Sequence, residues 1–476
     1  MICKIIKKIS KYNAFIYFFL YNKIGDDMNY NILRANDIRG EYPFDVNKKI
    51  AIIIGKAFGT YLNQINIEEC IIGHDNRISS KELTEGLTEG LLASGVNIID
   101  IGLVTTPMFN FASITLKKEY GIMITASHNK SSDNGFKIFG KDFLHLKQEE
   151  LKKVYQIIKE ENFIKGEGSI TNYDIKKEYI EMLKSKFGKI NKKIAVDCGN
   201  GTASIIIKDI FSNIFKEVTY LNCESDGSFP IHNPDPNEEE NLKWLKSVVK
   251  LRNLDLGIGI DGDADRVGII TDKGVMIGTD LLIGIHARDI IPNNDNKNVI
   301  LDVKCSCALI EDLKKIGANG IMVKNGSAYI ESVMHDTPAL IGGEYSGHIF
   351  FKDDYYGFDD GIYAALRTAK LIEKLNIPAN NLLDGFEKYY NSPEIRIDVS
   401  DDIKFKLVDK IKNYAISKKY DCNLCDGVRV NYQDGFSLVR CSNTSPQITL
   451  RFEAKDENTL NQRKEEFLNI INENIK

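Results

Sequence analysis

The sequence has little net charge, few cysteines and no long apolar run, and each of these features excludes a class of protein. Its 62 Lys and Arg residues stand against 67 Asp and Glu residues, which gives a formal net charge of −5 at pH 7. A chain without a basic field has no general attraction for nucleic acid or for anionic lipid. We therefore expect no nucleic-acid partner and no stable membrane insertion, and any phosphate recognition must be local.

The cysteines form no disulfide pattern. Nine of them occur in 476 residues, an odd number without a repeating spacing. This usage is typical of a reducing compartment, so we expect a cytoplasmic location. Cys305-x-Cys307 and Cys422-x-x-Cys425 each lack the second ligand pair of a zinc site, and we interpret them as small buried hydrophobes.

The N-terminal 27 residues resemble a signal peptide only in the order of their charges, with four lysines before the apolar run Ala14 to Tyr21. This run is far shorter than the about 20 residues that span a bilayer, and no small-x-small cleavage site follows it. A second methionine, Met28, stands directly before a well-patterned sequence. We interpret residues 1–27 either as a disordered or weakly membrane-attracted tail or as untranslated, and we favour a translation start at Met28.

The rest of the chain has the composition of a globular protein, with 43% hydrophobic and 27% charged residues. Short runs rich in Ile and Val alternate with longer segments of helical period, which is typical of α/β domains with largely parallel sheets. The runs expected to be buried strands are 71–72, 98–101, 121–125, 194–196, 256–260, 299–303 and 340–341. The segments expected to be helices are 81–93, 242–251, 281–290, 309–316 and 361–375.

The pattern changes after Ser392-Pro393 to strand, helix, strands, helix, which predicts an antiparallel α+β module with short strands at 429–431, 436–440 and 448–453. We therefore predict four domains packed around a shared cleft. In chain order, the expected segments are an extension at 1–27 and domains at 28–168, 169–272, 273–390 and 391–476. Asn237 and Glu240 also suggest a capping box for the helix at 242–251.

The first loop that can carry chemistry runs from residue 125 to residue 137, directly after an apolar strand. Open α/β sheets place ligands in loops at the carboxyl ends of their strands. Ser127 offers a nucleophile. However, side chains of neighbouring residues usually diverge, so we do not expect a hydrolase-type pair of Ser127 and His128, and no Gly-x-Ser-x-Gly elbow is present. Taken alone, this loop is explained better as a polar turn held by Asn134-Gly135.

The second loop, at 261–266, follows the expected strand at 256–260 and carries Asp261, Asp263 and Asp265. Three carboxylates at alternate positions can converge on one side of an extended loop, where their repulsion is costly without a cation. An EF-hand does not fit, because Arg266 occupies its glycine position and strands flank the loop. Oxygen ligands from three carboxylates suit Mg²⁺. We prefer this metal site to a solvated acidic turn.

Two further loops can bind polar ligands. In the loop 342–348, Glu344 and Ser346 offer an acceptor and a hydroxyl that suit sugar hydroxyl groups. In the loop 440–446, Arg440, several hydroxyls and the amides of a tight turn can form a phosphate cradle. Taken alone, the first is explained better as a glycine-rich turn, and a surface turn explains the second equally well.

Together and in this order, the four loops resemble those of the α-D-phosphohexomutase superfamily, most closely its phosphomannomutase/phosphoglucomutase branch. The resemblance runs from about Leu33 to the C-terminus and includes four further segments, Arg34 to Gly40, Gly73 to Arg77, Asp302 to Cys305 and Gly357 to Gly361. It implies three similar α/β domains with mainly parallel mixed sheets and a C-terminal α+β domain around a central cleft. This fold agrees with the pattern of elements described above.

The resemblance also implies the chemistry. Ser127 would be the phosphorylated residue, and Mg²⁺ would be bound by the three aspartates together with an oxygen of the Ser127 phosphate. The enzyme would exchange hexose 1-phosphate and hexose 6-phosphate, of mannose or glucose or both, through a hexose 1,6-bisphosphate. The remaining implied site residues are Lys137 and His348 as acid and base, Arg266 as a nearby cation, Arg39, Lys304, Glu344 and Ser346 near the substrate, and Arg440, Ser442, Asn443 and Thr444 at the non-reacting phosphate.

Three residues depart from the pattern usual in that family. Asn36 stands where tyrosine is common, Lys130 where proline is common and Ser327 where histidine is common. None of them removes the nucleophile or a metal ligand, but Asn36 and Ser327 leave the choice among sugars open. Tyr345 argues against the phosphoglucosamine mutase branch, which usually has glutamine there.

Two other classes of function stay open at this point. A Mg²⁺-dependent phosphohydrolase could use Asp261 as its nucleophile, although this would leave the Ser127 loop and the sugar loop unexplained. A catalytically silent sugar-phosphate-binding protein would be suggested by loss of Ser127 or of an aspartate, and neither is lost. The sequence does not decide between a monomer and a dimer.

Overall fold

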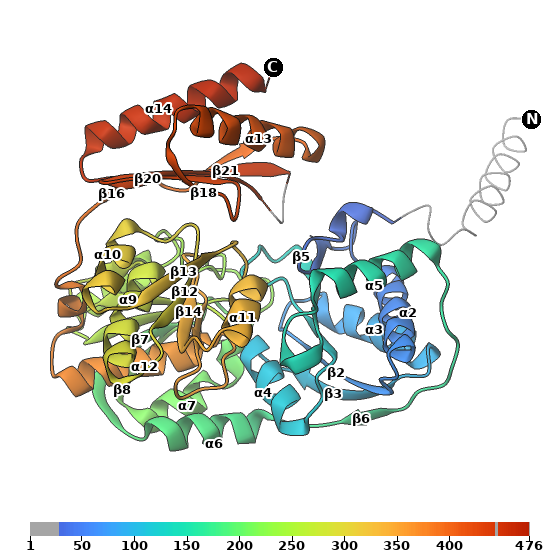
Figure 1. Cartoon of the computed structure of the whole chain (residues 1–476). Helices are drawn as coiled ribbons and strands as arrows, with labels where there is room; N and C mark the ends of the chain where they lie inside the picture. Colours follow the sequence, from blue (N-terminus) through green and yellow to red (C-terminus); the bar gives the residue numbers. More distant parts are fainter. Residues whose placement is uncertain (1–27, 443–445, 476) are drawn as a thin grey trace, which may run out of the picture.

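Four β-sheets, each packed against helices, make up the part of the chain that the computed structural model describes, residues 28–442 and 446–475 (Figure 1). The predictions made for residues 1–27 lie outside the described residues. Within the described ranges, no helix is both long enough and apolar enough to cross a membrane.

The first sheet positions the loop that carries Ser127, which follows one of its central strands. In spatial order its strands are β1 (Ile38–Glu41), β5 (Asp133–Phe139), β4 (Gly121–Ile124), β2 (Glu69–His74), β3 (Asn97–Leu103) and β6 (Ile170–Asn172). Its helices are α2 (Lys48–Gln64), α3 (Ser80–Ala93), α4 (Thr106–Leu116) and α5 (Gln148–Glu160). Strands β2 and β4 are parallel neighbours, with His74 opposite Ile124. The loops that follow these two strands therefore emerge side by side.

The second and third sheets are also mixed. The second sheet has the order β11 (Met276–Ile277), β10 (Val267–Thr271), β9 (Leu256–Ile260), β7 (Ile190–Asp197) and β8 (Phe215–Leu221), with helices α6 (Lys176–Phe187), α7 (Ile207–Ile214) and α8 (Lys243–Leu251). The third sheet has the order β13 (Asn319–Val323), β12 (Asn298–Asp302), β14 (Ile341–Gly343) and β15 (Ile349–Phe351), with helices α9 (Thr279–Ile290), α10 (Cys307–Lys315), α11 (Ser327–Asp336) and α12 (Gly361–Leu375). One continuous hydrophobic core includes Phe109, Ile194 and Leu301, so these three sheets are packed together rather than strung along a linker.

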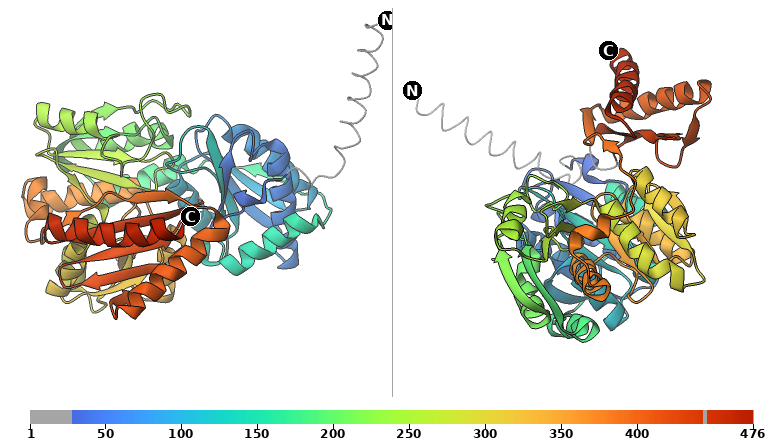
Figure 2. Two further views of the ribbon diagram at one scale, coloured as in Figure 1. Left: turned by 90° about the horizontal axis from the view of Figure 1, so that it is seen from above. Right: turned by 90° about the vertical axis from the view of Figure 1, so that its left-hand side faces the viewer.

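The fourth sheet is antiparallel throughout and has a hydrophobic core of its own. Its strands are β16 (Tyr390–Asn391), β21 (Gln447–Ala454), β20 (Gly435–Cys441), β19 (Val428–Tyr432) and β18 (Asp421–Asn423), while β17 (Ile395–Asp398) also pairs with β21. Helices α13 (Asp401–Ser417) and α14 (Glu457–Asn474) lie on the side of this sheet that faces away from the rest of the molecule (Figures 1 and 2). The opposite face is turned toward the third sheet.

This architecture confirms the predicted fold class, and the boundaries proposed for the four domains stay predictions. The capping box was wrong. Helix α8 begins at Lys243, and its N-cap residue Leu242 makes no side-chain cap. The side chain of Asn237 donates instead to the carbonyl oxygen of Ser346 and accepts from Thr279 Oγ1 at 3.3 Å. These partners lie outside the second sheet, so Asn237 bonds to distant segments and does not cap a helix.

Candidate active site

Ser127 lies after β4 in a turn whose backbone is held on two sides. Its φ of 53° is in the left-handed region, which a residue with a side chain rarely adopts unless its surroundings impose it. The amide of Ser127 donates to Thr125 Oγ1 at 2.8 Å, and its carbonyl oxygen accepts from Arg77 Nη2 at 2.7 Å. The hydroxyl faces the second sheet, where Ser127 Oγ donates to Asp261 Oδ2 at 3.1 Å.

His128 lies closer to the serine than the sequence analysis expected. Ser127 Oγ is 3.3 Å from His128 Nδ1. Neighbouring side chains usually diverge, but the left-handed conformation of Ser127 bends the chain enough to bring these two together. Burial lowers the pKa of His128, and the Arg266 cation lowers it further. The hydroxyl has a single proton, so it can donate either to this neutral ring or to Asp261 Oδ2.

Three carboxylates from the loop after β9 meet this hydroxyl. Asp261, Asp263 and Asp265 are buried, and one oxygen atom from each lies within 4.8 Å of the others. Asp263 Oδ1 and Asp265 Oδ1 are buried and have no hydrogen-bond partner among the described residues. A buried carboxylate oxygen without a partner is costly unless a cation takes it. The donor set therefore fits a hard divalent ion, as the spacing of the aspartates predicted.

The carboxylates act on one another and on a buried lysine. Burial raises the pKa of Asp261, and the charges of Asp265 and Asp263 raise it further. Lys137 Nζ lies 2.8 Å from Asp263 Oδ2 and 2.5 Å from Asp265 Oδ2. Burial acts to lower the pKa of Lys137, but the two carboxylates raise it overall, so this side chain is a cation. Burial acts to raise the pKa of Asp265, but Lys137 and then His348 lower it overall.

Arg266, the residue directly after the carboxylates, contacts His348 from the loop after β14. Arg266 Nε donates to His348 Nε2 at 2.9 Å, and His348 Nδ1 lies 2.6 Å from Asp359 Oδ2. Burial lowers the pKa of His348 to about 4, so the ring is neutral at pH 7. A neutral imidazole has one donor and one acceptor nitrogen. Arg266 can only donate, so Nε2 is the acceptor nitrogen and the ring proton is on Nδ1.

The predicted sugar-binding residues lie beside this histidine. His348 Nε2 is 3.9 Å from Glu344 Oε2, and Ser346 Oγ donates to the same carboxylate oxygen at 3.0 Å. Glu344 Oε1 accepts from Asn325 Nδ2 at 3.1 Å and from the amide of Gly326. Glu344 is therefore held by its own loop and by the loop after β13.

Lys304 is buried where the third and fourth sheets meet. Its Nζ is 3.6 Å from Glu394 Oε2 and 5.8 Å from the centre of the Tyr345 ring. Two arginines of the fourth sheet hold its backbone. Arg451 donates to the carbonyl oxygen of Lys304, and Arg429 donates to the two flanking carbonyl oxygens at 2.6 and 2.8 Å. The C-terminal module thus fixes the loop that carries Lys304.

Arg440 lies at the end of β20 with part of its guanidinium unused. Its Nε donates to Asp426 Oδ2 at 2.7 Å, whereas its Nη2 is buried and has no hydrogen-bond partner within the described residues. Asp426 also accepts from the amide of Asn325 at 3.1 Å, which connects this arginine to the third sheet. Ser442 is buried, and its carbonyl oxygen accepts from Lys404 Nζ at 3.0 Å. Two residues predicted for the same loop lie outside the described residues, Asn443 and Thr444.

Arg39 and the unusual residue Asn36 lie on the side of the first sheet. Arg39 Nη1 donates to Asn129 Oδ1 at 3.1 Å, which places it against the loop of Ser127. A Cβ atom built on Gly326 would lie 3.0 Å from Asn36 Nδ2. Asn36 therefore faces the turn that precedes Ser327, so two of the three departures from the family pattern lie near each other.

Some side chains of the site were not selected from the sequence. Thr106 Oγ1 and Thr125 Oγ1 donate to Asp263 Oδ2 at 2.7 and 3.2 Å. Thr106 stands 157 positions before Asp263, and no local pattern connects them. Asp359 belongs to the segment from Gly357 to Gly361, which contributed only to the family resemblance. Its position beside a second acidic residue, just before a helix, was the available signal.

The comparisons with known proteins agree along the chain. Models of the phosphoglucomutase/phosphomannomutase family match in order, as alpha/beta/alpha domain I at 31–165, domain II at 177–274, domain III at 279–389 and the C-terminal domain at 394–470. A phosphomannomutase/phosphoglucomutase of Pseudomonas aeruginosa is 37% identical over 441 residues, which cover 92% of this chain and 95% of that protein. A phosphoglucomutase of Neisseria gonorrhoeae is 35% identical over 455 residues, 93% and 97% of the two chains. The crystal structure of a phosphoglucomutase/phosphomannomutase family protein from Burkholderia thailandensis superimposes with a TM-score of 0.86 at 32% identity, covering 94% of this chain and 98% of that one.

Proposed function

The chain belongs to the phosphoglucomutase/phosphomannomutase family of intramolecular phosphotransferases, and from this premise we propose that it exchanges hexose 1-phosphate and hexose 6-phosphate through a phosphoserine at Ser127. The phosphoryl group passes from Ser127 to the free hydroxyl of a mannose or glucose monophosphate. The P–O bond to Ser127 breaks and a P–O bond to the sugar oxygen forms, while the sugar hydroxyl gives its proton to His348 and the released Ser127 Oγ takes a proton from Lys137. The resulting hexose 1,6-bisphosphate turns in the cleft and returns its other phosphate to Ser127. We place this activity in the cytoplasm.

The observation that carries the proposal is the hydrogen bond of 3.1 Å between Ser127 Oγ and Asp261 Oδ2. It joins a nucleophile and a carboxylate from different sheets. Asp261, Asp263 and Asp265, with an oxygen of the Ser127 phosphate, would hold Mg²⁺. Two of their carboxylate oxygens have no hydrogen-bond partner in the described part of the chain, which supports this assignment. Such an ion would neutralise charge on the phosphoryl group that is transferred.

We assign His348 as the general base. A base must be unprotonated and within reach of the hydroxyl proton. Lys137 is held as a cation between two carboxylates, whereas His348 is neutral and its Nε2 is the acceptor nitrogen. Nε2 takes the hydroxyl proton when Arg266 turns from His348 to the phosphoryl group. Lys137 and Arg266 then supply positive charge beside the transferred group.

The remaining assignments place the substrate. Glu344 and Ser346 bind sugar hydroxyls, because one is an acceptor and the other is a hydroxyl in the same loop. Arg440 binds the non-reacting phosphate through Nη2, which is buried and has no hydrogen-bond partner within the described residues. The other residues assigned to substrate are Arg39, Lys304, Ser442, Asn443 and Thr444.

The test is peptide mapping by mass spectrometry after incubation with glucose 1,6-bisphosphate, together with coupled assays on glucose 1-phosphate and mannose 1-phosphate. We expect a labile phosphate on Ser127 and turnover of one or both sugars. A phosphate on Asp261 would support the phosphohydrolase instead, although both oxygens of Asp261 already accept hydrogen bonds, from Ser127 Oγ and from the amide of Arg266 at 3.1 Å. Absence of both phosphorylation and turnover would indicate a binding protein.

A further inference from the structure

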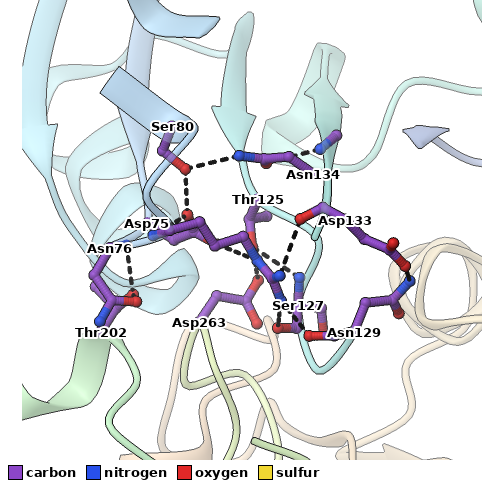
Figure 3. A network of polar contacts seen from close by, with 12 residues as sticks. Asp75, Asn76, Ser80, Thr125, Ser127, Asn129, Asp133, Asn134, Thr202 and Asp263 are labelled. Carbon is purple, nitrogen blue, oxygen red and sulfur yellow. Dashed lines mark hydrogen bonds and ion pairs between the residues drawn. The ribbon is translucent and has the colours of Figure 1, made fainter. Parts of the chain in front are cut away.

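The turn formed by residues 75–77 touches both loops of the proposed reaction centre, although none of its residues is assigned to that centre. It follows β2, the parallel neighbour of β4, so it lies beside the loop of Ser127. Figure 3 shows Asp75 and Asn76 between Ser127 and Asp263 on one side and Thr202 of the second domain on the other.

Arg77 holds the backbone of the Ser127 loop. Its side chain is fully buried, and its guanidinium uses all five of its N–H donors. The acceptors are Asp75 Oδ2 (3.1 Å) and the carbonyl oxygens of Ser127 (2.7 Å), Asn129 (2.8 Å), Lys130 (2.6 Å) and Asp133 (3.0 Å). Four carbonyl oxygens of the loop between residues 127 and 133 are therefore held by one rigid, planar group.

Asn76 connects the same turn to the second sheet. Its Nδ2 donates to the carbonyl oxygen of Asn200 at 2.7 Å and to Ser225 Oγ at 3.0 Å, and its amide donates to Thr202 Oγ1 at 3.1 Å. The amide of Thr202 donates in turn to the carbonyl oxygen of Gly262 at 2.8 Å. Gly262 lies between the first two aspartates, so two hydrogen bonds connect Asn76 to the carboxylate loop.

Where the 75–77 turn and the Ser127 loop meet the second domain, the backbones leave no room for a methyl group. A Cβ atom on Gly227 would lie 2.1 Å from the carbonyl oxygen of Asn76, and a Cβ atom on Gly262 would lie 2.4 Å from the carbonyl oxygen of Ser127. Carbon and oxygen atoms do not approach so closely, and backbone cannot turn aside as a flexible side chain can. A shift of the turn must therefore displace the Ser127 loop relative to the carboxylate loop.

We propose that the 75–77 turn is a positioning element that sets where Ser127 Oγ lies relative to the three aspartates. The inference rests on the proposed function. Arg77 reaches Ser127 only through its carbonyl oxygen, and Asn76 reaches the aspartates only through Thr202, so neither acts on the reacting atoms. The substrate contacts assigned above come from other loops. A displaced turn slows phosphoryl transfer while substrate affinity is kept, and a misplacement of about 1 Å can cost about 10²-fold in rate.

Two variants test this with matched controls. Asn76→Ala removes two donors from a half-buried position, and Gly227→Ala pushes against the turn from the second domain. Asn63→Ala is the control for the first, because Asn63 Nδ2 likewise makes two donor hydrogen bonds, to the carbonyl oxygens of Gly59 at 2.8 Å and Ser94 at 2.9 Å, but inside the first domain. Gly320→Ala is the control for the second, because its Cβ would meet only leucine methyl groups at 3.3 Å.

The measurements are kcat and KM separately, the rate of Ser127 phosphorylation by glucose 1,6-bisphosphate, and Tm. We expect kcat and the phosphorylation rate of both test variants to fall between about 10-fold and 10²-fold, with KM within about twofold of wild type. We expect the controls to keep both rates. If Gly227→Ala does not fold, Asn76→Ala decides alone.

Two kinds of failure are distinguishable. If wild-type protein gains no phosphate on Ser127, the proposed function fails, whatever the variants do. If wild-type protein is phosphorylated and active and the test variants keep wild-type kcat, the positioning proposal alone is overturned. A fall in kcat that the control variants share equally would also overturn it, because it would report only general loss of structure.

Discussion

Replacing Asp263 with asparagine removes one charge from the carboxylate loop and keeps the size of the side chain. Asp263 Oδ2 accepts from Thr106 Oγ1, Thr125 Oγ1 and Lys137 Nζ, whereas Oδ1 has no hydrogen-bond partner among the described residues. The new amide will keep its oxygen toward the three donors. Its NH₂ group then takes the place of Oδ1, where it cannot bind a cation.

The magnitude follows from this geometry. The three structural hydrogen bonds survive, so we expect the free energy of unfolding to change by no more than about 1–2 kcal/mol. One preorganised electrostatic contact at a reacting group is typically worth about 10²–10³ in kcat, or about 2.7–4 kcal/mol. We therefore expect turnover of Asp263→Asn to fall by about 10²–10³-fold and its Mg²⁺ affinity to fall as well.

The assay combines calorimetric titration with Mg²⁺, steady-state kinetics and thermal unfolding. Asp255→Asn is the matched control, because Asp255 precedes the opposite end of β9 and accepts from the Lys193 amide at 2.7 Å. We expect this control to keep wild-type turnover and Mg²⁺ affinity. Full activity of a folded Asp263→Asn protein in the presence of chelator would refute the reasoning.

Three further predictions use other parts of the chain. Ser127→Ala should bind hexose phosphate but turn it over at least about 10³-fold more slowly, and undiminished turnover would exclude the phosphoserine. Arg440→Ala should raise KM by about 10-fold or more and lower kcat less, because a charge-assisted hydrogen bond to the non-reacting phosphate is worth about 1.5–3 kcal/mol in ground and transition states alike; an unchanged KM in steady-state kinetics would count against the assignment. His145 Nδ1 lies 2.9 Å from Glu331 Oε2, and although burial acts to lower the pKa of His145, the glutamate raises it overall. A group whose pKa is raised in the folded state stabilises the fold at low pH, and this stabilisation is lost as the pH rises through the folded-state pKa. The stability advantage of wild type over Glu331→Gln, measured by denaturant unfolding, should therefore shrink between pH 6 and pH 9. An advantage that grows over this range would contradict the prediction.

The elements that could be predicted from the sequence are those with strong local signals. The expected segments 361–375 and 256–260 coincide with α12 and β9. Asp360 caps α12 by accepting from the Tyr363 amide at 2.8 Å, and β9 is a continuous apolar run. Helix α2 was not among the helices expected from the sequence. It packs so closely on α3 that a Cβ atom on Gly55 would lie 2.4 Å from the carbonyl oxygen of Leu87.

The residues of the candidate site could likewise be predicted only where the signal was local. Residue types and spacing alone favoured a site only in the aspartate loop, whose predicted cluster the structure places together, whereas the other three loops were selected by the family resemblance. The contacts between loops could not be predicted, because they depend on how whole domains pack. Asn237 shows why: its polar side chain fits a local helix cap, but the structure uses it to bind Ser346 from the third domain. Arg77 is a second case, since four of its five acceptors become visible only when two neighbouring strands are placed side by side.

The charges of the site give a reason to expect an ion at one end of the substrate and not at the other. The two cations assigned to the transferred phosphoryl group are already engaged, Lys137 with Asp263 and Asp265, and Arg266 with His348. A substrate phosphate entering there must compete with buried carboxylates, so it gains little from these cations until the carboxylates have another partner. Arg440 is in the opposite position, because its Nη2 is buried with no hydrogen-bond partner within the described residues. On the proposed function, we therefore expect protein groups alone to hold phosphate at the fourth domain, and phosphate binding at Ser127 to depend on a cation that first satisfies the aspartates.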